Sequence, residues 1–106
     1  MSVLPQRLTL ATMGRSALCL FPLRSVARDQ LDDDTWLMHE LGFGEYVERR
    51  VEPTMQLRFP SGGRITYLHG DRRFLEERMR GMSVALVEGA DLVDEHLVHI
   101  ITRERA

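Results

Sequence analysis

Hydrophobic and polar positions alternate along the first half of the chain in blocks that predict helices and a strand. Residues 3–13 predict a weak helix, in which Pro5 is tolerated only in the first turn. Residues 16–21 are an apolar run of strand length that is closed by a proline. Residues 24–41 have apolar positions at helical spacing, and Gly42 supplies the C-terminal stop.

The second half of the chain continues the alternation. Residues 55–59 and 65–67 alternate apolar and polar side chains around a Pro-Ser-Gly-Gly turn, which predicts a β-hairpin with a polar outer face. Residues 72–80 predict a short charged helix. Residues 84–87, Val-Ala-Leu-Val, are typical of a strand covered on both faces. Residues 91–104 predict a final amphipathic helix.

Strands covered on both faces that alternate with helices predict the α/β class. We expect a mostly parallel sheet with flanking helices and one β-hairpin insertion, in a single domain over residues 1–106. The composition, with 43% hydrophobic and 28% charged residues, is that of a globular domain.

The basic residues change the range of possible chemistry, because all 14 are arginine and the chain has no lysine. This excludes a Schiff base, a Ser–Lys dyad and the phosphate-binding lysine of a P-loop. The net charge of −2 gives no global electrostatic case for nucleic-acid binding. The single cysteine, Cys19, excludes an intrachain disulfide and a cysteine-cluster metal site. No apolar run approaches the ~18 residues of a membrane span. We expect a cytoplasmic protein.

The charges are unevenly distributed. Residues 1–28 contain four arginines and no acid, whereas residues 29–57 contain eight acids and two arginines. A basic, acid-free start has the composition of a transit peptide, which leaves import of a nuclear-encoded protein as an alternative. Cleavage would, however, remove the predicted strand at residues 16–21. The acidic run at residues 32–34 is most simply a solvated helix face.

Three segments resemble, in order and approximate spacing, motifs of the ATPase domain of phage terminase large subunits, which are P-loop translocases similar to helicases. Residues 18–30 (Leu-Cys-Leu-Phe-Pro-Leu-Arg-Ser-Val-Ala-Arg-Asp-Gln) resemble the strand that follows the P-loop helix, with Leu23 in place of a threonine. Residues 57–68 (Leu-Arg-Phe-Pro-Ser-Gly-Gly-Arg-Ile-Thr-Tyr-Leu) resemble the terminase hairpin. Residues 80–91 (Arg-Gly-Met-Ser-Val-Ala-Leu-Val-Glu-Gly-Ala-Asp) resemble the Arg-Gly and Walker B run.

The chain also departs from this family, since it has neither the glycine-rich phosphate loop nor its lysine. Glu88 stands where the family has the metal-organising aspartate, and Gly89 replaces the glutamate that polarises water. The resemblance therefore implies a degenerate nucleotide and Mg site at Glu88 and Asp91, with no catalytic residue. The order of the segments leaves open whether Glu88 or Asp94 lies at the strand end.

The resemblance implies a truncated, degenerate or split ATPase domain that is associated with phage DNA packaging or translocation. We expect no ATP hydrolysis by this chain alone, and binding of ATP and Mg only if a partner chain supplies the missing loop. A phage origin implies the host cytoplasm. This interpretation requires residues 84–87 to lie inside the sheet, and a position at the sheet margin would overturn it.

Three arginines are candidates for weak contact with phosphate or the DNA backbone, namely Arg24, Arg28 and Arg80. Arginine suits phosphate, and so does the start of a helix, where Arg24 and Arg28 are predicted to lie. The alternative is that these side chains form ion pairs with nearby acids such as Asp32.

Two other groups of residues are weaker candidates for a functional site. Glu95, His96 and His99 lie within one helical turn and are ligand types for zinc, but such a group on a solvated helix is usually plain surface, and we expect no metal site. Ser16 and Ser25 lack a nucleophile elbow.

The alternative from a different class is a small stand-alone α/β module that binds a protein partner without nucleotide chemistry. An exposed sheet edge would favour such a partner or self-association.

Overall fold

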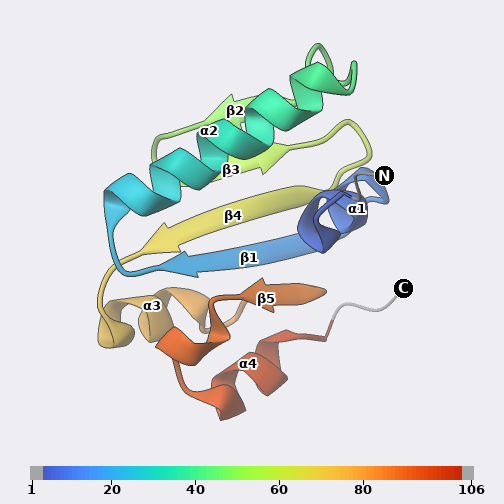
Figure 1. Cartoon of the computed structure of the whole chain (residues 1–106). Coiled ribbons are helices and arrows are strands. Elements are labelled where there is room, and N and C mark those ends of the chain that lie inside the picture. The colour runs from blue at the N-terminus through green and yellow to red at the C-terminus, as the bar shows by residue number, and fades with distance from the viewer. Residues whose placement is uncertain (1–3, 104–106) are drawn as a thin grey trace.

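A five-stranded sheet with the order β2-β3-β4-β1-β5 forms the centre of the computed structural model, which describes residues 4–103 (Figure 1). The strands are β1 (Ser16–Phe21), β2 (Glu48–Arg50), β3 (Met55–Arg58), β4 (Arg64–His69) and β5 (Leu86–Glu88). The helices are α1 (Gln6–Thr12), α2 (Arg24–Glu40), α3 (Arg72–Met79) and α4 (Glu95–Ile101), with a 3₁₀ turn η1 (Ala90–Leu92) before α4.

The sheet is mixed. β1 pairs in parallel with β4 and β5, whereas β3 pairs antiparallel with both β4 and β2. The predicted α/β class is confirmed, but the prediction of a mostly parallel sheet is wrong because half of the pairings are antiparallel. The hairpin formed by β3 and β4 is not an insertion beside the sheet but part of it. β4 pairs with β1, and β2 pairs with the other side of β3.

Most helices follow the periodicity of the sequence. α2 and α3 match the predicted ranges closely. α1 is shorter than predicted, because it begins directly after Pro5, which lies at its N-cap and not inside its first turn. The helix predicted at residues 91–104 is divided, because Asp94 caps α4 by accepting a hydrogen bond from the backbone N–H of His96 at 2.9 Å. The ends of two predicted helices, residue 3 and residue 104, lie outside the described residues.

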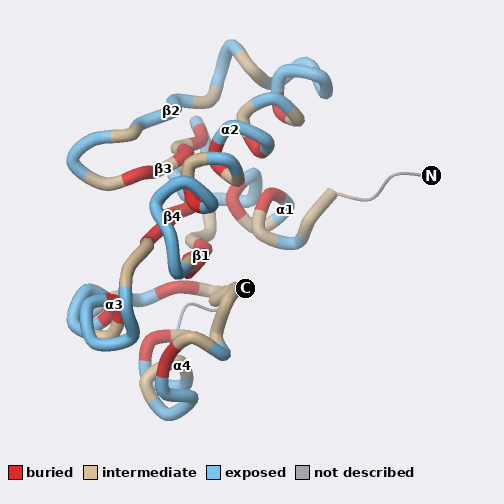
Figure 2. Tube along the Cα trace, turned by 60° about the vertical axis from the view of Figure 1, so that its left-hand side comes forward, coloured by how far each residue is buried: buried red, intermediate tan, exposed pale blue. Residues whose placement is uncertain are grey.

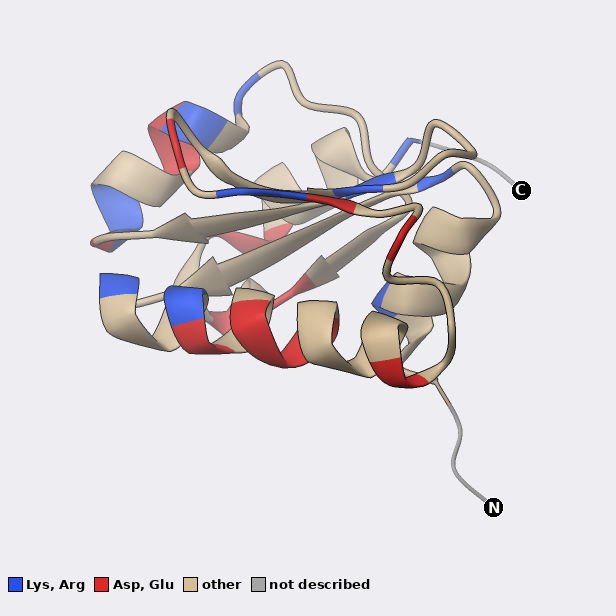
Figure 3. Cartoon of the chain, turned by 90° about the horizontal axis from the view of Figure 1, so that it is seen from above, with Lys and Arg blue, Asp and Glu red and all other residues tan. Residues whose placement is uncertain are grey.

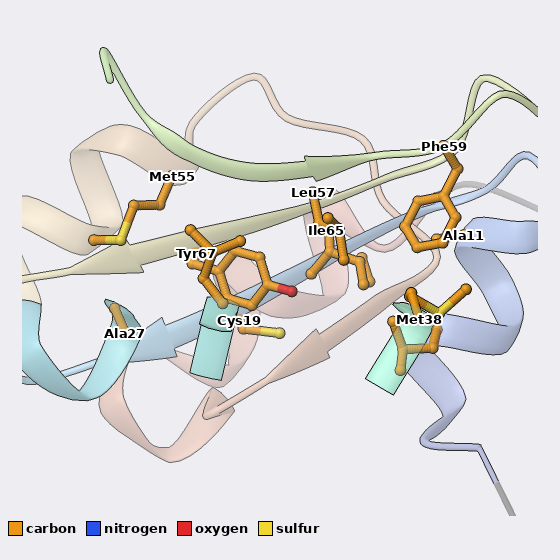
Figure 4. Packing of buried hydrophobic residues seen from close by; sticks show 12 residues of the cluster. Ala11, Cys19, Ala27, Met38, Met55, Leu57, Phe59, Ile65 and Tyr67 are labelled. Carbon is orange, nitrogen blue, oxygen red and sulfur yellow. The ribbon is translucent and has the colours of Figure 1, made fainter. Parts of the chain in front are cut away.

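Two cores lie on opposite faces of the sheet. Alternate residues of β1 face opposite ways: Ala17 and Cys19 belong to the core beneath α1 and α2, while Leu18 and Leu20 belong to the core beneath α3 and α4. Figure 4 shows the first core, in which side chains of β3 and β4 pack against those of α1 and α2. Buried positions gather on the sheet and the inner sides of the helices (Figure 2). β1 is therefore the doubly covered strand that its apolar run predicts.

The strand predicted at residues 84–87 differs from expectation. β5 pairs with β1 alone and forms one edge of the sheet, and its three residues are partly exposed. Val84 is 2% exposed but precedes the strand, and its N–H donates a hydrogen bond to the carbonyl of Ile101 at 2.9 Å. The prediction of an interior strand is wrong, because packing against α4 accounts for the burial of Val84.

Candidate functional site

A network of charged and polar side chains lies beneath α1 and α2. Nε of Arg7 donates a hydrogen bond to Oδ2 of Asp34 at 2.8 Å, and its Nη2 donates to Oδ1 at 2.7 Å. Nη1 of Arg7 donates to Oε1 of Glu88 at 3.0 Å. The hydroxyl of Tyr67 donates to Oδ2 of Asp34 at 2.6 Å, and the amide of Gln30 donates to Oδ1 at 3.0 Å. We call these five side chains the Arg7 network.

The strand register explains how the network assembles. Tyr67, Cys19 and Glu88 are paired in register across β4, β1 and β5, so their side chains share one face of the sheet. α2 adds Asp34, which is 2% exposed. The acidic run at residues 32–34 is therefore not simply a solvated face, and the interpretation from the sequence was wrong for Asp34.

A signal for the burial of Asp34 was present in the sequence. Ala27, Leu31, Asp34 and Met38 follow one another at helical spacing, and all four are buried. The acid thus occupies a position in the apolar stripe of α2. The identity of its partner was not visible in the same way, because Arg7 lies in another helix.

The environment shifts the pKa of Arg7, of Tyr67 and of the neighbouring Cys19. The hydrogen bond with Asp34 raises the pKa of Arg7 above its ordinary value, although burial opposes this shift. Burial, reinforced by the charge of Asp34, raises the pKa of the Tyr67 hydroxyl well above its ordinary value. Burial also raises the pKa of the Cys19 thiol. Arg7 therefore stays cationic, while Tyr67 and Cys19 stay protonated, so neither of the two is an acid–base group or nucleophile at neutral pH.

The structure separates the acids that the terminase resemblance groups together. Glu88 is the last residue of β5, so it is Glu88 and not Asp94 that lies at the strand end. Its side chain is 37% exposed and contacts Arg7. Asp91 lies exposed in η1 and is not part of the Arg7 network. Asp94 caps α4, and its N–H donates to Oε2 of Glu76 at 2.8 Å.

Two of the three candidate arginines lie beside acids. Nη2 of Arg24 is 3.3 Å from Oε1 of Glu52, and Nε of Arg28 is 3.8 Å from Oδ2 of Asp32. The alternative of ion pairs thus fits both positions, and both pairs are exposed enough to remain accessible to solvent. Arg80 lies exposed at the C-terminal end of α3.

A small pocket lies at the carboxyl end of β4, the edge at which open α/β sheets bind ligands. Its volume is about 130 Å³, and its lining includes His69, Arg24 and Arg78. Nη2 of Arg78 donates to the hydroxyl of Thr54 at 3.1 Å. Glu52 also lines the pocket and offsets part of its positive charge.

Of the three side chains of α4 that were considered as zinc ligands, only Glu95 and His99 lie near each other. Nε2 of His99 lies 3.7 Å from Oε1 of Glu95, and both side chains are exposed. Among residues 4–103, no group of three or more His, Cys, Asp or Glu side chains is placed to hold a metal ion. Across the same residues, no helix is both long and apolar enough to cross a membrane.

Comparisons of the chain with protein-family models, with curated proteins and with solved structures find no match. Function must therefore be inferred from the chemistry and geometry of the chain itself.

Proposed function

We propose that the chain is one part of a split, terminase-like ATPase domain that acts in phage DNA packaging or translocation and does not hydrolyse ATP by itself. One observation carries the proposal: β4, β1 and β5 are parallel neighbours, and an acid, Glu88, ends β5 beside β1. A Walker B strand presents its acid in this way, at the carboxyl edge of parallel strands. A phage origin would place the protein in the host cytoplasm.

The surroundings of Glu88 support the absence of independent hydrolysis. Its carboxylate already accepts a hydrogen bond from Arg7, and the chain contains no lysine to bind a β- or γ-phosphate. Gly89 follows with φ at +80°, and a Cβ there would lie 2.5 Å from the carbonyl oxygen of Leu20. The glutamate that the terminase family has at this position would not fit without movement of the backbone.

The edge position of β5 restricts the form of the proposal. The interpretation from the sequence required residues 84–87 to lie inside the sheet, and their position at its margin overturns that interpretation for this chain as a self-contained domain, whether truncated or degenerate. The split version remains, in which a separate polypeptide brings the phosphate loop with its lysine and adds a strand beside β5. Unpaired N–H and C=O groups of an edge strand are suited to such an addition.

The test combines the purified chain with the product of a neighbouring reading frame that carries a glycine-rich, lysine-containing loop. We expect the chain alone to bind Mg-ATP more weakly than about 100 µM, or about −5.5 kcal/mol, by calorimetry. The two polypeptides together should bind Mg-ATP more tightly than this limit. Glu88→Gln should weaken this binding, whereas the matched change Asp91→Asn should not. Tight binding by the chain alone, or no gain in Mg-ATP binding from any such partner, would overturn the proposal.

A second candidate function is a protein-binding module without nucleotide chemistry. It is favoured by an apolar groove of about 360 Å³ that lies between the two ends of α1, the loop after α2 and the turn of the hairpin. Phe43 and Tyr46 line this groove and are 48% and 60% exposed. Light scattering after size exclusion tests for self-association through such surfaces. A monomer at all concentrations would count against self-association, and a dimer weakened by Tyr46→Ser would support it.

A further inference from the structure

One face of the sheet carries a concentration of arginine that the net charge conceals. Leu57 and Ile65 pair in register and point into the core beneath α2, so their neighbours in β3 and β4 point to the opposite side. The register extends this opposite side to β2. We call it the open sheet face, and its residues are Glu48, Arg50, Gln56, Arg58, Arg64 and Thr66, with Arg78 of α3 at its border.

The helices leave this part of the sheet without an apolar cover. The second core, beneath α3 and α4, contains Leu18 and Leu20 of β1 and Leu68 of β4, but no residue of β2 or β3. Arg50 and Arg64 are exposed and Arg58 is partly exposed. The acids of α2 lie on the other side of the sheet (Figure 3). The two sides of the sheet therefore differ in charge.

Two arginines of the open sheet face repel each other. Arg58 and Arg64 are directly opposite in the β3–β4 register, where Cβ atoms are about 5 Å apart and like charges destabilise a sheet. Within residues 4–103, neither forms an ion pair with a carboxylate, in contrast to Arg49 with Asp32 at 2.6 Å. An anion from outside the chain would relieve this repulsion.

Two hollows on the face give such an anion places to bind. One, of about 280 Å³, is lined by Arg58, Arg64 and the two turn glycines Gly62 and Gly63, and Glu48 and Phe59 complete it. The other, of about 250 Å³, is lined by Arg64, Arg78 and the polar side chains of Thr54, Gln56 and Thr66, together with Leu68 and Met82. Arg64 borders both hollows. Arginine guanidinium groups bind phosphate oxygens with two parallel hydrogen bonds.

We propose that the open sheet face binds the phosphate backbone of double-stranded nucleic acid. Four arginines face a single acid, Glu48, which is already paired with Arg50 at 3.0 Å. None of the six strand residues of the face is aromatic or large and apolar, and the nearest exposed aromatic ring is that of Phe74 at the border, beside Arg78. A protein interface would need apolar anchors across the face, and a single strand would need several aromatic side chains for stacking. Phosphate contacts, in contrast, use arginine and small polar donors. The inference rests on this face alone and stands or falls separately from the proposed function.

The test measures binding of a fluorescent DNA duplex by anisotropy over a range of salt concentrations. Wild-type chain should bind with a log–log salt slope of about −3, from three to four phosphate contacts. Arg58→Gln/Arg64→Gln should weaken binding about tenfold at low salt and reduce the slope by about 2. The matched control Arg24→Gln/Arg28→Gln removes the same charge from α2 and should change the affinity less than about threefold.

Several outcomes would overturn the proposal. The first is that the wild-type chain does not bind the duplex. The second is that both double variants lose the same amount of affinity, and the third is that only Arg24→Gln/Arg28→Gln loses affinity. Equally effective competition by polyglutamate would assign the face to an acidic protein segment. Loss of self-association in Arg58→Gln/Arg64→Gln, without loss of DNA binding, would assign it to a second copy. Arg58→Lys/Arg64→Lys guards against misfolding, because it keeps the charge and should retain most of the binding.

Discussion

Arg7 and Asp34 are joined by two parallel hydrogen bonds of 2.8 and 2.7 Å, although α1 and α2 place them 27 residues apart. Asp34 is 2% exposed and accepts further hydrogen bonds from Tyr67 and Gln30. The pair links both helices to the sheet through Glu88. A buried carboxylate with this many donors depends on its cation, and the first prediction follows from that dependence.

Arg7→Met is expected to lower the free energy of unfolding by about 3–5 kcal/mol, because it leaves the buried carboxylate of Asp34 without its cation. Urea titration followed by circular dichroism measures the change. Arg72→Met is the control, since it removes an exposed ion pair with Glu76 and should cost less than about 1 kcal/mol. Losses of equal size in the two variants would contradict the role assigned to Arg7.

The second prediction concerns alkaline pH. The pKa of Tyr67 is raised in the folded chain above its ordinary value of 10.0, because burial and Asp34 disfavour the phenolate. A raised pKa gives stability that is complete below about pH 10 and declines as the pH rises further. Tyr67→Phe should therefore flatten the decline in unfolding free energy above pH 10. It should also cost about 1.5–3 kcal/mol at neutral pH through the lost hydrogen bond to a charged group.

The check on Tyr67 is urea unfolding at several pH values on either side of 10, with wild-type and Tyr67→Phe chains in parallel. Cys19 also has a raised pKa, but it is common to both chains and cancels in the comparison. An identical pH dependence in the two chains would remove Tyr67 as the cause.

The third prediction compares two glycines with similar backbone conformations. Gly89 and Gly42 have φ of +80° and +85°, but a Cβ at Gly89 would lie 2.5 Å from a backbone oxygen, whereas none lies near Gly42. Gly42→Ala should cost about 1 kcal/mol from the left-handed conformation alone. Gly89→Ala should cost more than twice that, because β1 or β5 must move. Equal losses in thermal stability would mean that the close approach of Gly89 to Leu20 adds nothing to the cost of the substitution.

The fourth prediction is a gain in stability. Arg58→Gln/Arg64→Gln should raise the free energy of unfolding by about 0.2–1 kcal/mol, because it removes like charges that lie opposite each other. Increasing salt should reduce the difference between variant and wild type. Arg50→Gln is the control and should not stabilise, since Arg50 is paired with Glu48. A variant less stable than wild type would show that the two arginines have partners within the fold.

Local pattern predicted the elements well where a single periodicity extends over many residues. The strand at residues 16–21, α2 and the hairpin all follow from such patterns. β2 (Glu48–Arg50) was missed because three charged residues have no apolar alternation, and their pairing depends on β3. The run at residues 84–87 was assigned to the interior because an apolar run does not distinguish burial by helices from burial between strands.

The candidate sites were harder to predict, because they depend on contacts between distant residues. Glu88 was identified as a strand-end acid, but its partner Arg7 lies 81 residues away. The open sheet face was not predicted, since the net charge of −2 averages its arginines with the acids of α2. Only the strand register separates the two groups.

The two edge strands of the sheet, β2 and β5, differ in sequence, and this difference affects where another strand can be added. β2 presents the sequence Glu-Arg-Arg, a charged edge that discourages an added strand, whereas β5 presents Leu-Val-Glu. Addition of a strand is therefore favoured at β5 and disfavoured at β2. Assembly by strand addition would stop after a single step, which gives a closed pair and not an endless fibre.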